Sequence, residues 1–144
     1  MMNTISIEAL LGGPEVIGRT IRTEFDLFEI GKRGLPKRAL TFLVKNTNLT
    51  IRSLSRILHT TERTLQRKKE ADLLSEGISE QLLQIAEVYS RGQEVFNTMD
   101  DFQIWMSSPN VALGKRVPLE LLSSRFGAQM VLDEIGRIEH GVFS

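Results

Sequence analysis

The sequence predicts an all-α protein with two helical parts, and three observations support this fold class. Apolar residues recur at three- and four-residue steps along most of the chain after residue 35, which is the spacing of one helix face. Ser, Thr, Asp or Pro precedes several of these stretches, as expected at helix starts. Charged residues are grouped in blocks. With 144 residues, 41% of them hydrophobic, the chain can bury one ordinary core or two small ones.

Composition excludes several classes of protein. The absence of cysteine excludes a disulfide framework, thiol catalysis and a cysteine-based zinc site. Uninterrupted apolar runs extend over only a few residues, so we expect no transmembrane helix and no membrane partner. The first residues lack the basic start and long apolar stretch of a secretory signal. We therefore expect a cytoplasmic protein.

The net charge of zero conceals a strong asymmetry. Residues 1–31 carry two basic and five acidic side chains, residues 32–69 carry eleven basic and one acidic, and residues 70–144 carry five basic and twelve acidic. Such a distribution points to a nucleic-acid-binding part joined to an acidic part with another role. The alternative is a solvated basic surface without a partner, because net charge bears on non-specific binding and not on fold.

Three helices are predicted in the basic block. The first begins at Leu35-Pro36, since proline is well placed in a first turn. The polar residues 46–48 form the loop after it. The second begins at about Thr50, and the third has Thr61 as its N-cap. The apolar positions are, in order, Ala39, Leu40, Leu43 and Val44, then Ile51, Leu54, Ile57 and Leu58, then Leu65.

The spacing between Ser55, His59 and Leu65 is typical of a helix-turn-helix. Ser55 is small where two helices must approach closely. His59 lies four residues later, at the turn that needs a left-handed backbone, which histidine tolerates better than most residues. Leu65 follows six residues later and returns to the core. The predicted domains are an N-terminal segment of residues 1–31, a helix-turn-helix DNA-binding domain of residues 32–76 and a C-terminal domain of residues 77–144.

This register places the start of the third helix where a recognition helix reaches base edges in the major groove. The expected base-contacting residues are Thr61, Glu62, Arg63, Gln66 and Arg67. The expected phosphate contacts are Arg52, Arg56, Lys68 and Lys69. Because helix-turn-helix proteins commonly read paired half-sites, we also expect a homodimer on operator DNA. The alternative is an ordinary three-helix cluster with charged outer faces.

The acidic part is predicted as a second helical module. Ser79 is expected to cap a long helix whose apolar stripe extends from Leu82 to Met99, interrupted by Gly92 at a cost of about 1 kcal/mol. Asp100 and Asp101 are candidates to cap the next helix. A loop is expected over residues 107–114.

Two more helices complete this module. Pro118 opens the first of them, which Gly127 is expected to end, and the last carries Met130, Val131, Ile135 and Ile138. The apolar Val142 and Phe143 are unusual at a chain end. They either fold back on the core, which is the commoner outcome, or insert into a pocket of a partner.

Several motifs occur in an order that resembles a known family. They are Gly34-Leu35-Pro36, Arg63-Thr64-Leu65-Gln66-Arg67, Trp105-Met106 with Pro109-Asn110 and Ala112-Leu113-Gly114, Pro118-Leu119 with Leu121-Leu122, and Arg137-Ile138-Glu139-His140-Gly141-Val142. Over residues 32–144 the chain resembles the Xre/ParS/MbcA-type antitoxins of bacterial type II toxin–antitoxin systems. Residues 1–30 match nothing specific.

The resemblance implies an Xre-like helix-turn-helix domain followed by a small helical toxin-binding domain. The implied partner is a RES-domain toxin, an enzyme that attacks NAD or uses it for ADP-ribosylation, and the implied complex represses its own operon. The last residues of such antitoxins reach into the toxin's active site, which reverses the preference for a tail folded back on the core. The implied toxin-binding residues are Arg137, Ile138, Glu139, His140, Gly141, Val142, Phe143 and Ser144.

We expect no enzymatic activity, no cofactor and no metal site. The chain has two histidines, of which His59 already has a role in a turn and His140 lies in the terminal segment. Neither Gly12-Gly13 nor the pair Gly31 and Gly34 has the spacing of a phosphate-binding loop. The main alternative function is a free-standing helix-turn-helix transcriptional regulator with an oligomerisation domain.

Overall fold

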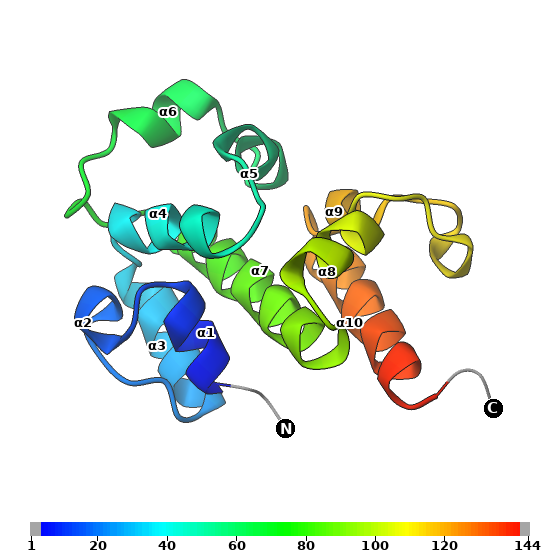
Figure 1. Cartoon of the computed structure of the whole chain (residues 1–144). Coiled ribbons are helices and arrows are strands. Elements are labelled where there is room, and N and C mark those ends of the chain that lie inside the picture. Colours follow the sequence, from blue (N-terminus) through cyan, green and yellow to red (C-terminus); the bar gives the residue numbers. More distant parts are fainter. Residues whose placement is uncertain (1–3, 142–144) are drawn as a thin grey trace.

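A computed structural model describes residues 4–141. Within this range the chain forms ten α-helices and one short 3-10 helix, with two isolated bridges and no strand, so the all-α prediction is confirmed (Figure 1). The elements are α1 Thr4–Leu10, α2 Pro14–Ile17, α3 Glu24–Arg33, α4 Lys37–Asn46, α5 Ile51–Ile57, α6 Glu62–Arg67, α7 Glu76–Val95, α8 Met99–Met106, η1 Val111–Leu113, α9 Pro118–Leu121 and α10 Arg125–Glu139.

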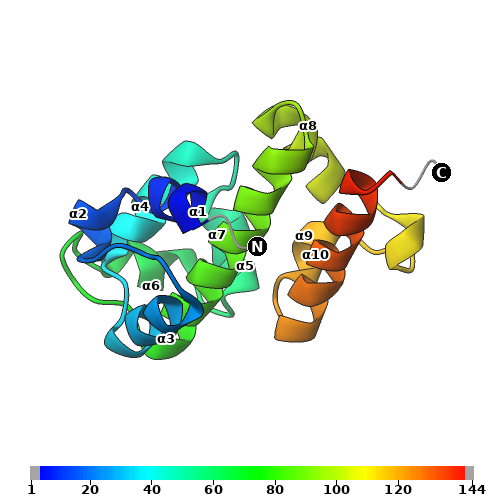
Figure 2. The ribbon, with the colours of Figure 1, turned by 90° about the horizontal axis from the view of Figure 1, so that it is seen from below.

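The long helix α7 is the centre of the molecule. Helices α1, α3 and α10 pack against it, and α3 and α10 lie on opposite sides of it (Figure 2). Because α7 is covered from several sides, its buried residues form a broad face that is wider than a single stripe. They are Ser79, Leu82, Leu83, Ile85, Ala86, Val88, Tyr89, Ser90 and Gly92.

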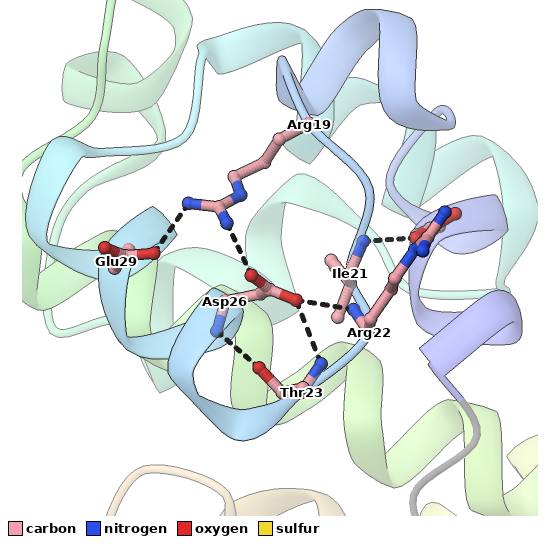
Figure 3. Close-up of polar contacts among 7 residues, drawn as sticks. Arg19, Ile21, Arg22, Thr23, Asp26 and Glu29 are labelled. Carbon is pink, nitrogen blue, oxygen red and sulfur yellow. Dashed lines mark hydrogen bonds and ion pairs between the residues drawn. The ribbon is translucent and has the colours of Figure 1, made fainter.

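The N-terminal segment, for which the sequence predicts no role, contributes to the same core. Its buried apolar side chains are Ile7, Leu10, Leu11, Ile17, Ile21 and Ile30. A capping box starts α3: the backbone N–H of Asp26 donates to the Thr23 hydroxyl, and the Asp26 carboxylate accepts from the Thr23 N–H. Arg19 pairs with Asp26 at 2.5 Å and with Glu29 at 2.9 Å (Figure 3). Hydrogen bonds from the backbone of Arg22 and Thr23 hold the pKa of Asp26 below its usual value.

The three helices predicted in the basic block are present, and the predicted cap Thr61 is confirmed. Thr50 caps the second helix, and Pro36 is the N-cap residue of α4 instead of lying in its first turn. The hydroxyl of Thr50 accepts from Ser53 N–H at 3.0 Å, and that of Thr61 accepts from Thr64 N–H at 3.0 Å. His59 has a φ of 55°, so the left-handed turn residue is confirmed. Ser55 and Leu65 are both buried, as the helix-turn-helix register requires.

The predicted start and end of the long acidic helix are wrong. Its N-cap is Ser75, whereas Ser79 is buried inside the helix, where its hydroxyl accepts from Leu35 N–H at 2.8 Å. The helix ends at Val95, so the stripe does not continue to Met99, which begins α8. Gly92 is required here, because a Cβ at this position would lie 2.4 Å from the Phe102 ring.

Two further details of the C-terminal module differ from the predictions. Thr98 caps α8, and Asp100 and Asp101 lie in its first turn, where carboxylates favour the helix dipole. Gly127 does not end a helix: α9 stops at Leu121, and Gly127 donates its N–H at 2.9 Å to the hydroxyl of Ser124, the cap of α10. The last helix, α10, carries Met130, Val131, Ile135 and Ile138 as predicted, and Met130 is 44% exposed, outside the buried face of the helix.

Candidate functional site

The first candidate site is the exposed side of α5, α6 and the segment after them, here called the basic face. It comprises Arg52, Arg56, Thr61, Glu62, Arg63, Gln66, Arg67, Lys68 and Lys69, all of them exposed. Helix α6 buries only Leu65 and lies at the outer edge of the molecule (Figure 1). The structure therefore leaves every predicted DNA-contacting residue exposed to solvent.

The arginines of the basic face have no partners among the described residues. The side chains of Arg52, Arg56, Arg63 and Arg67 make no hydrogen bond or ion pair within residues 4–141. Thr61 is different, because its hydroxyl already caps α6 and also bonds to the Thr64 hydroxyl at 2.8 Å. Guanidinium groups without an internal partner can pair with phosphates or base edges without first breaking a bond inside the protein.

The segment after α6 is fixed to the start of α4. Lys37 Nζ donates to the carbonyl oxygen of Lys68 at 3.2 Å and pairs with Glu70 at 3.5 Å. The backbone N–H of Lys69 donates to Asp72 at 2.9 Å. These bonds use the main chain of Lys68 and Lys69, so both ammonium groups stay available to solvent.

The second candidate site is the C-terminal end of α10. Arg137 is paired with Glu134 of its own helix, with its two nitrogens at 2.8 and 2.5 Å from one carboxylate oxygen. Glu139 is paired with Arg91 of α7 at 2.6 Å. Of the remaining predicted residues, Ile138 is half-buried, His140 is exposed and Gly141 has a φ of 77°. Val142, Phe143 and Ser144 lie outside the described residues.

The ion pair between α7 and α10 also alters two protonation equilibria. The hydrogen bond from Arg91 holds the pKa of the Glu139 carboxyl below its usual value. The same bond raises the pKa of Arg91. Glu139 is therefore an engaged anion at neutral pH, and its charge is already offset inside the protein.

Sequence reasoning missed several exposed apolar side chains of the C-terminal module. Ile104, Val111 and Phe126 are 65%, 82% and 85% exposed. Phe126 follows the Ser124 cap and precedes the buried Gly127 and Ala128, so it falls on the outer side of α10. The signal was available in the sequence, because Phe126 lies off the stripe formed by Val131, Ile135 and Ile138, but it was not recognised.

The helix-turn-helix and the C-terminal module contact each other directly. His59 Nε2 lies 3.2 Å from the carbonyl oxygen of Ser123, and Asn48 donates to Asp100 at 2.7 Å. A cavity of about 640 Å³ lies at this junction, with Arg56 and Glu120 among its lining residues. The turn before the basic face is thus in contact with the segment that precedes α10.

The described part of the chain has neither a candidate membrane span nor a candidate metal site. Among residues 4–141, no helix is both long enough and apolar enough to cross a membrane. Within the same residues, no three His, Cys, Asp or Glu side chains are grouped as a metal ion would require.

Comparison with known proteins assigns these two regions. Residues 26–87 match the Antitoxin Xre-like helix-turn-helix domain, and residues 91–141 match the Antitoxin Xre/MbcA/ParS C-terminal toxin-binding domain. The chain is 58% identical over 40 residues to a protein named Antitoxin Xre from Yersinia enterocolitica, which covers 28% of this chain and 27% of that protein. It thus aligns with about a quarter of the length of that relative.

A solved structure supports the same assignment over a longer stretch. A chain of the MbcT-MbcA toxin–antitoxin complex of M. tuberculosis is 28% identical to this chain, with a TM-score of 0.54. The match covers 67% of this chain and 86% of that one. The two domain matches leave only residues 88–90 between them and account for the chain from α3 to the end of α10. The chain therefore belongs to the Xre/MbcA/ParS antitoxin family, with an Xre-like helix-turn-helix domain followed by the C-terminal toxin-binding domain.

Proposed function

We propose that this chain neutralises a cognate RES-domain toxin, an NAD-consuming or ADP-ribosylating enzyme, by occluding its active site, and that it represses its own operon. The observation that carries the proposal is the match of residues 91–141 to a toxin-binding domain. This range leads directly into residues 142–144, to which we assign the contact with the active site. In the structure the last turn of α10 is held on α7, so the segment that follows it starts from a fixed point. The chain acts as a cover for an enzyme and not as an enzyme.

We call the last residues of the chain, which we propose enter the toxin's active site, the plug. The chemistry expected of the plug follows from the toxin's substrate. A pocket that accepts NAD recognises anionic phosphates and an aromatic base. Phe143 offers an aromatic ring to such a pocket. Glu139 is less suited to this mimicry, because Arg91 already pairs with its carboxylate. We therefore assign the contact inside the pocket to Val142, Phe143 and Ser144, and the support of the plug to residues 137–141.

Neutralisation is tested with the product of the adjacent reading frame. The two proteins are co-purified, and NAD consumption by the toxin is measured with and without this chain. Full protection is expected from the whole chain, and deletion of Val142–Ser144 is expected to restore toxicity on co-expression. Protection by the truncated chain equal to that by the whole chain would contradict the plug, whereas failure to co-purify would contradict the partnership itself.

Repression is assigned to the basic face acting on operator DNA as a homodimer. A gel-shift assay on the promoter fragment of the operon tests this assignment. The double substitution of Arg63 and Arg67 by Ala is expected to weaken binding roughly 100-fold, since each lost bidentate contact is worth about 1–3 kcal/mol. Arg137→Ala is the matched control, because it removes an arginine from the other site. Unchanged affinity of the double variant would contradict the assignment.

A free-standing transcriptional regulator is the second candidate, and one observation favours it. Phe25 and Phe28 of α3 are 77% and 56% exposed, as expected for a surface that self-associates. In that case the chain would dimerise and bind DNA without any toxin partner. Light scattering gives the mass of the free chain, and the co-purification above separates the two functions.

A further inference from the structure

The side of α10 that faces solvent carries two large apolar side chains in succession. Phe126 is 85% exposed, and Met130, one turn later on the same side of the helix, is 44% exposed. The exposed Asp133 and Arg137 continue this side at the next turns. The opposite side of α10 packs against α7 (Figure 2). We call Phe126, Met130, Asp133 and Arg137 the outer face of α10.

The place of this apolar pair in the chain points to a partner. Within the described part of residues 91–141, the exposed large apolar side chains are Ile104, Val111, Phe126 and Met130. Ile104 lies on α8 and Val111 on η1, whereas Phe126 and Met130 share one side of one helix. Contiguous exposed apolar surface marks interaction sites, unlike scattered apolar residues, and aromatic residues and methionine are enriched in interfaces.

Gly136, three residues after Asp133, is a second sign of a partner at this helix. Glycine in a helix interior is unfavourable relative to alanine. Gly127 of the same helix is required by packing, since a Cβ there would lie 2.0 Å from the Leu121 carbonyl oxygen. A Cβ at Gly136 would meet no described atom within 4 Å, and the backbone of Gly136 is not left-handed. Because glycine also allows another chain to approach closely, its presence here fits a surface that a partner covers.

We infer that the outer face of α10, together with Gly136, is the docking surface for the cognate toxin, and that an apolar depression outside the toxin's active site receives Phe126 and Met130. This inference rests on the proposed function. The toxin is the occupant because the whole face lies within residues 91–141, which match a toxin-binding domain. A second copy of this chain has a separate exposed apolar surface available on α3.

The polar half of the outer face is held in a fixed geometry. Arg137 pairs with Glu134 at 2.5 Å, and Gln129 donates to the Asp133 carboxylate at 2.9 Å. Charged groups at the rim of an interface act on orientation and association rate more than on affinity. The apolar half therefore supplies the affinity, while closure of the active site is the task of another part of the chain. Loss of docking should raise the amount of chain needed for inhibition and leave maximal inhibition unchanged.

The first test removes the aromatic anchor. Binding of the whole chain to the toxin is measured by isothermal titration calorimetry, and inhibition of NAD consumption is titrated in parallel. Phe126→Ala is expected to weaken binding about 30-fold, as is typical of an aromatic hot spot. The midpoint of inhibition should shift by a similar factor, and inhibition should still become complete at high concentration. Phe25→Ala, at a 77% exposed position of α3, is the matched control and should leave the affinity for the toxin unchanged.

The second test separates docking from damage to the fold. Gly136→Ala should raise the urea midpoint of the free chain, because alanine is the better helix former and the added methyl group meets open space. The same methyl group should weaken toxin binding by about fivefold or more, since interfaces are packed as closely as protein interiors. Gly77→Ala is the matched control, because Gly77 also lies in a helix and also faces open space. It should leave the affinity for the toxin unchanged.

Failure of the inference is distinguishable from failure of the proposed function. If the toxin binds Phe126→Ala and Gly136→Ala as tightly as the unsubstituted chain, the inference is overturned and the proposed function stands. A loss of maximal inhibition in Phe126→Ala would place this side chain in the active site and would also overturn a separate docking surface. A lower mass of the free chain in Phe126→Ala, measured by light scattering, would assign the face to a second copy instead. An unsubstituted chain that does not bind the toxin would overturn the proposed function itself.

Discussion

The basic face and the end of α10 use arginine in opposite ways. On the basic face, Arg63 and Arg67 are exposed and have no partner within residues 4–141. At the end of α10, Arg137 is bound to Glu134, and Arg91 is bound to Glu139. An internal ion pair would have to be broken before an arginine could neutralise a phosphate, so a surface for a polyanion keeps its cations free. At the end of α10 the same kind of pair instead fixes the geometry of the last helical turn.

The two regions also differ in how they are held. Helix α6 buries one side chain, Leu65, and depends on its cap and its neighbours for its position. Helix α10 buries a whole face that includes Val131, Glu134 and Ile135 against α7. We therefore expect the stability of α6 to be sensitive to changes at the surface, and that of α10 to be sensitive to changes in the core.

The largest expected effect is on stability, at the aromatic core that Phe102 forms with Tyr89 and Trp105. Phe102 packs edge-on against Tyr89 with ring centroids 5.0 Å apart, and it stacks with Trp105 at 6.0 Å. Phe102→Ala should lower the free energy of unfolding by about 3–5 kcal/mol. Phe126→Ala, at an 85% exposed position of the same module, should change it by less than about 0.5 kcal/mol. Urea denaturation measures both, and similar values for the two variants would break the comparison.

The next effect concerns charge on the basic face. Replacement of Lys68 and Lys69 by Ala should weaken operator binding in low salt and lower the slope of log affinity against log salt by about 0.9 per lost phosphate contact. Stability should not change, because both side chains are exposed. Fluorescence anisotropy at several salt concentrations gives the slope. An unchanged slope would show that these lysines do not meet phosphate.

A smaller effect separates the two possible roles of Thr61. Thr61→Ala removes the cap of α6 and should cost about 1 kcal/mol of stability, with weaker DNA binding as a result. Thr61→Ser keeps the capping hydroxyl and should restore stability. If Thr61→Ser is stable but still binds DNA weakly, the threonine methyl group contacts a base, and the residue does more than cap.

The smallest expected effect is on how stability depends on pH, and it has opposite signs at Glu87 and Glu139. Burial, aided by the nearby Glu24, raises the pKa of Glu87 above its ordinary value of 4.5. The stability that its protonation contributes is complete below the unfolded pKa and is lost as the pH rises through the folded one. Glu87→Gln should therefore stabilise the protein near neutral pH, by about 0.5 kcal/mol or less after allowance for partial exposure, and the gain should vanish in acid.

Glu139 provides the matched contrast. Its pKa is lowered by Arg91, so its contribution is present above the unfolded pKa and is lost as the pH falls through the folded one. Thermal unfolding of Glu87→Gln and Glu139→Gln, each compared with the unsubstituted chain across the acidic range, should give differences of opposite slope. Parallel curves would contradict these assignments.

The helix-turn-helix could be predicted from sequence because its signals are local. Thr50 and Thr61 are caps within one turn of the helices that they start, and His59 marks the left-handed turn by its residue type and spacing. The excess of basic residues between positions 32 and 69 then indicated that the outer sides of these helices are exposed. Each of these signals depends on residues only a few positions apart, so no knowledge of tertiary packing was needed.

The C-terminal module was harder because its signals depend on tertiary contacts. Ser79 has the residue type of a cap, but it is buried where it can satisfy the backbone of Leu35, which is distant in sequence. Gly127 has the residue type of a helix end, but it lies in the first turn of α10. Glycine is needed at this position because a Cβ would lie 2.0 Å from the Leu121 carbonyl oxygen. The roles of Arg91 and of the N-terminal segment also depend on pairings across the fold, which periodicity does not reveal.

One consequence follows from the continuity of α7. The two family matches end and begin at residues 87 and 91, inside a helix that is unbroken from Glu76 to Val95. Helix α7 thus contributes side chains to the core of both modules. A protease that cut this shared helix would disrupt both modules at once, and under the proposed function repression and neutralisation would then end together. The same proposal predicts that the operon is released at the same moment as the toxin.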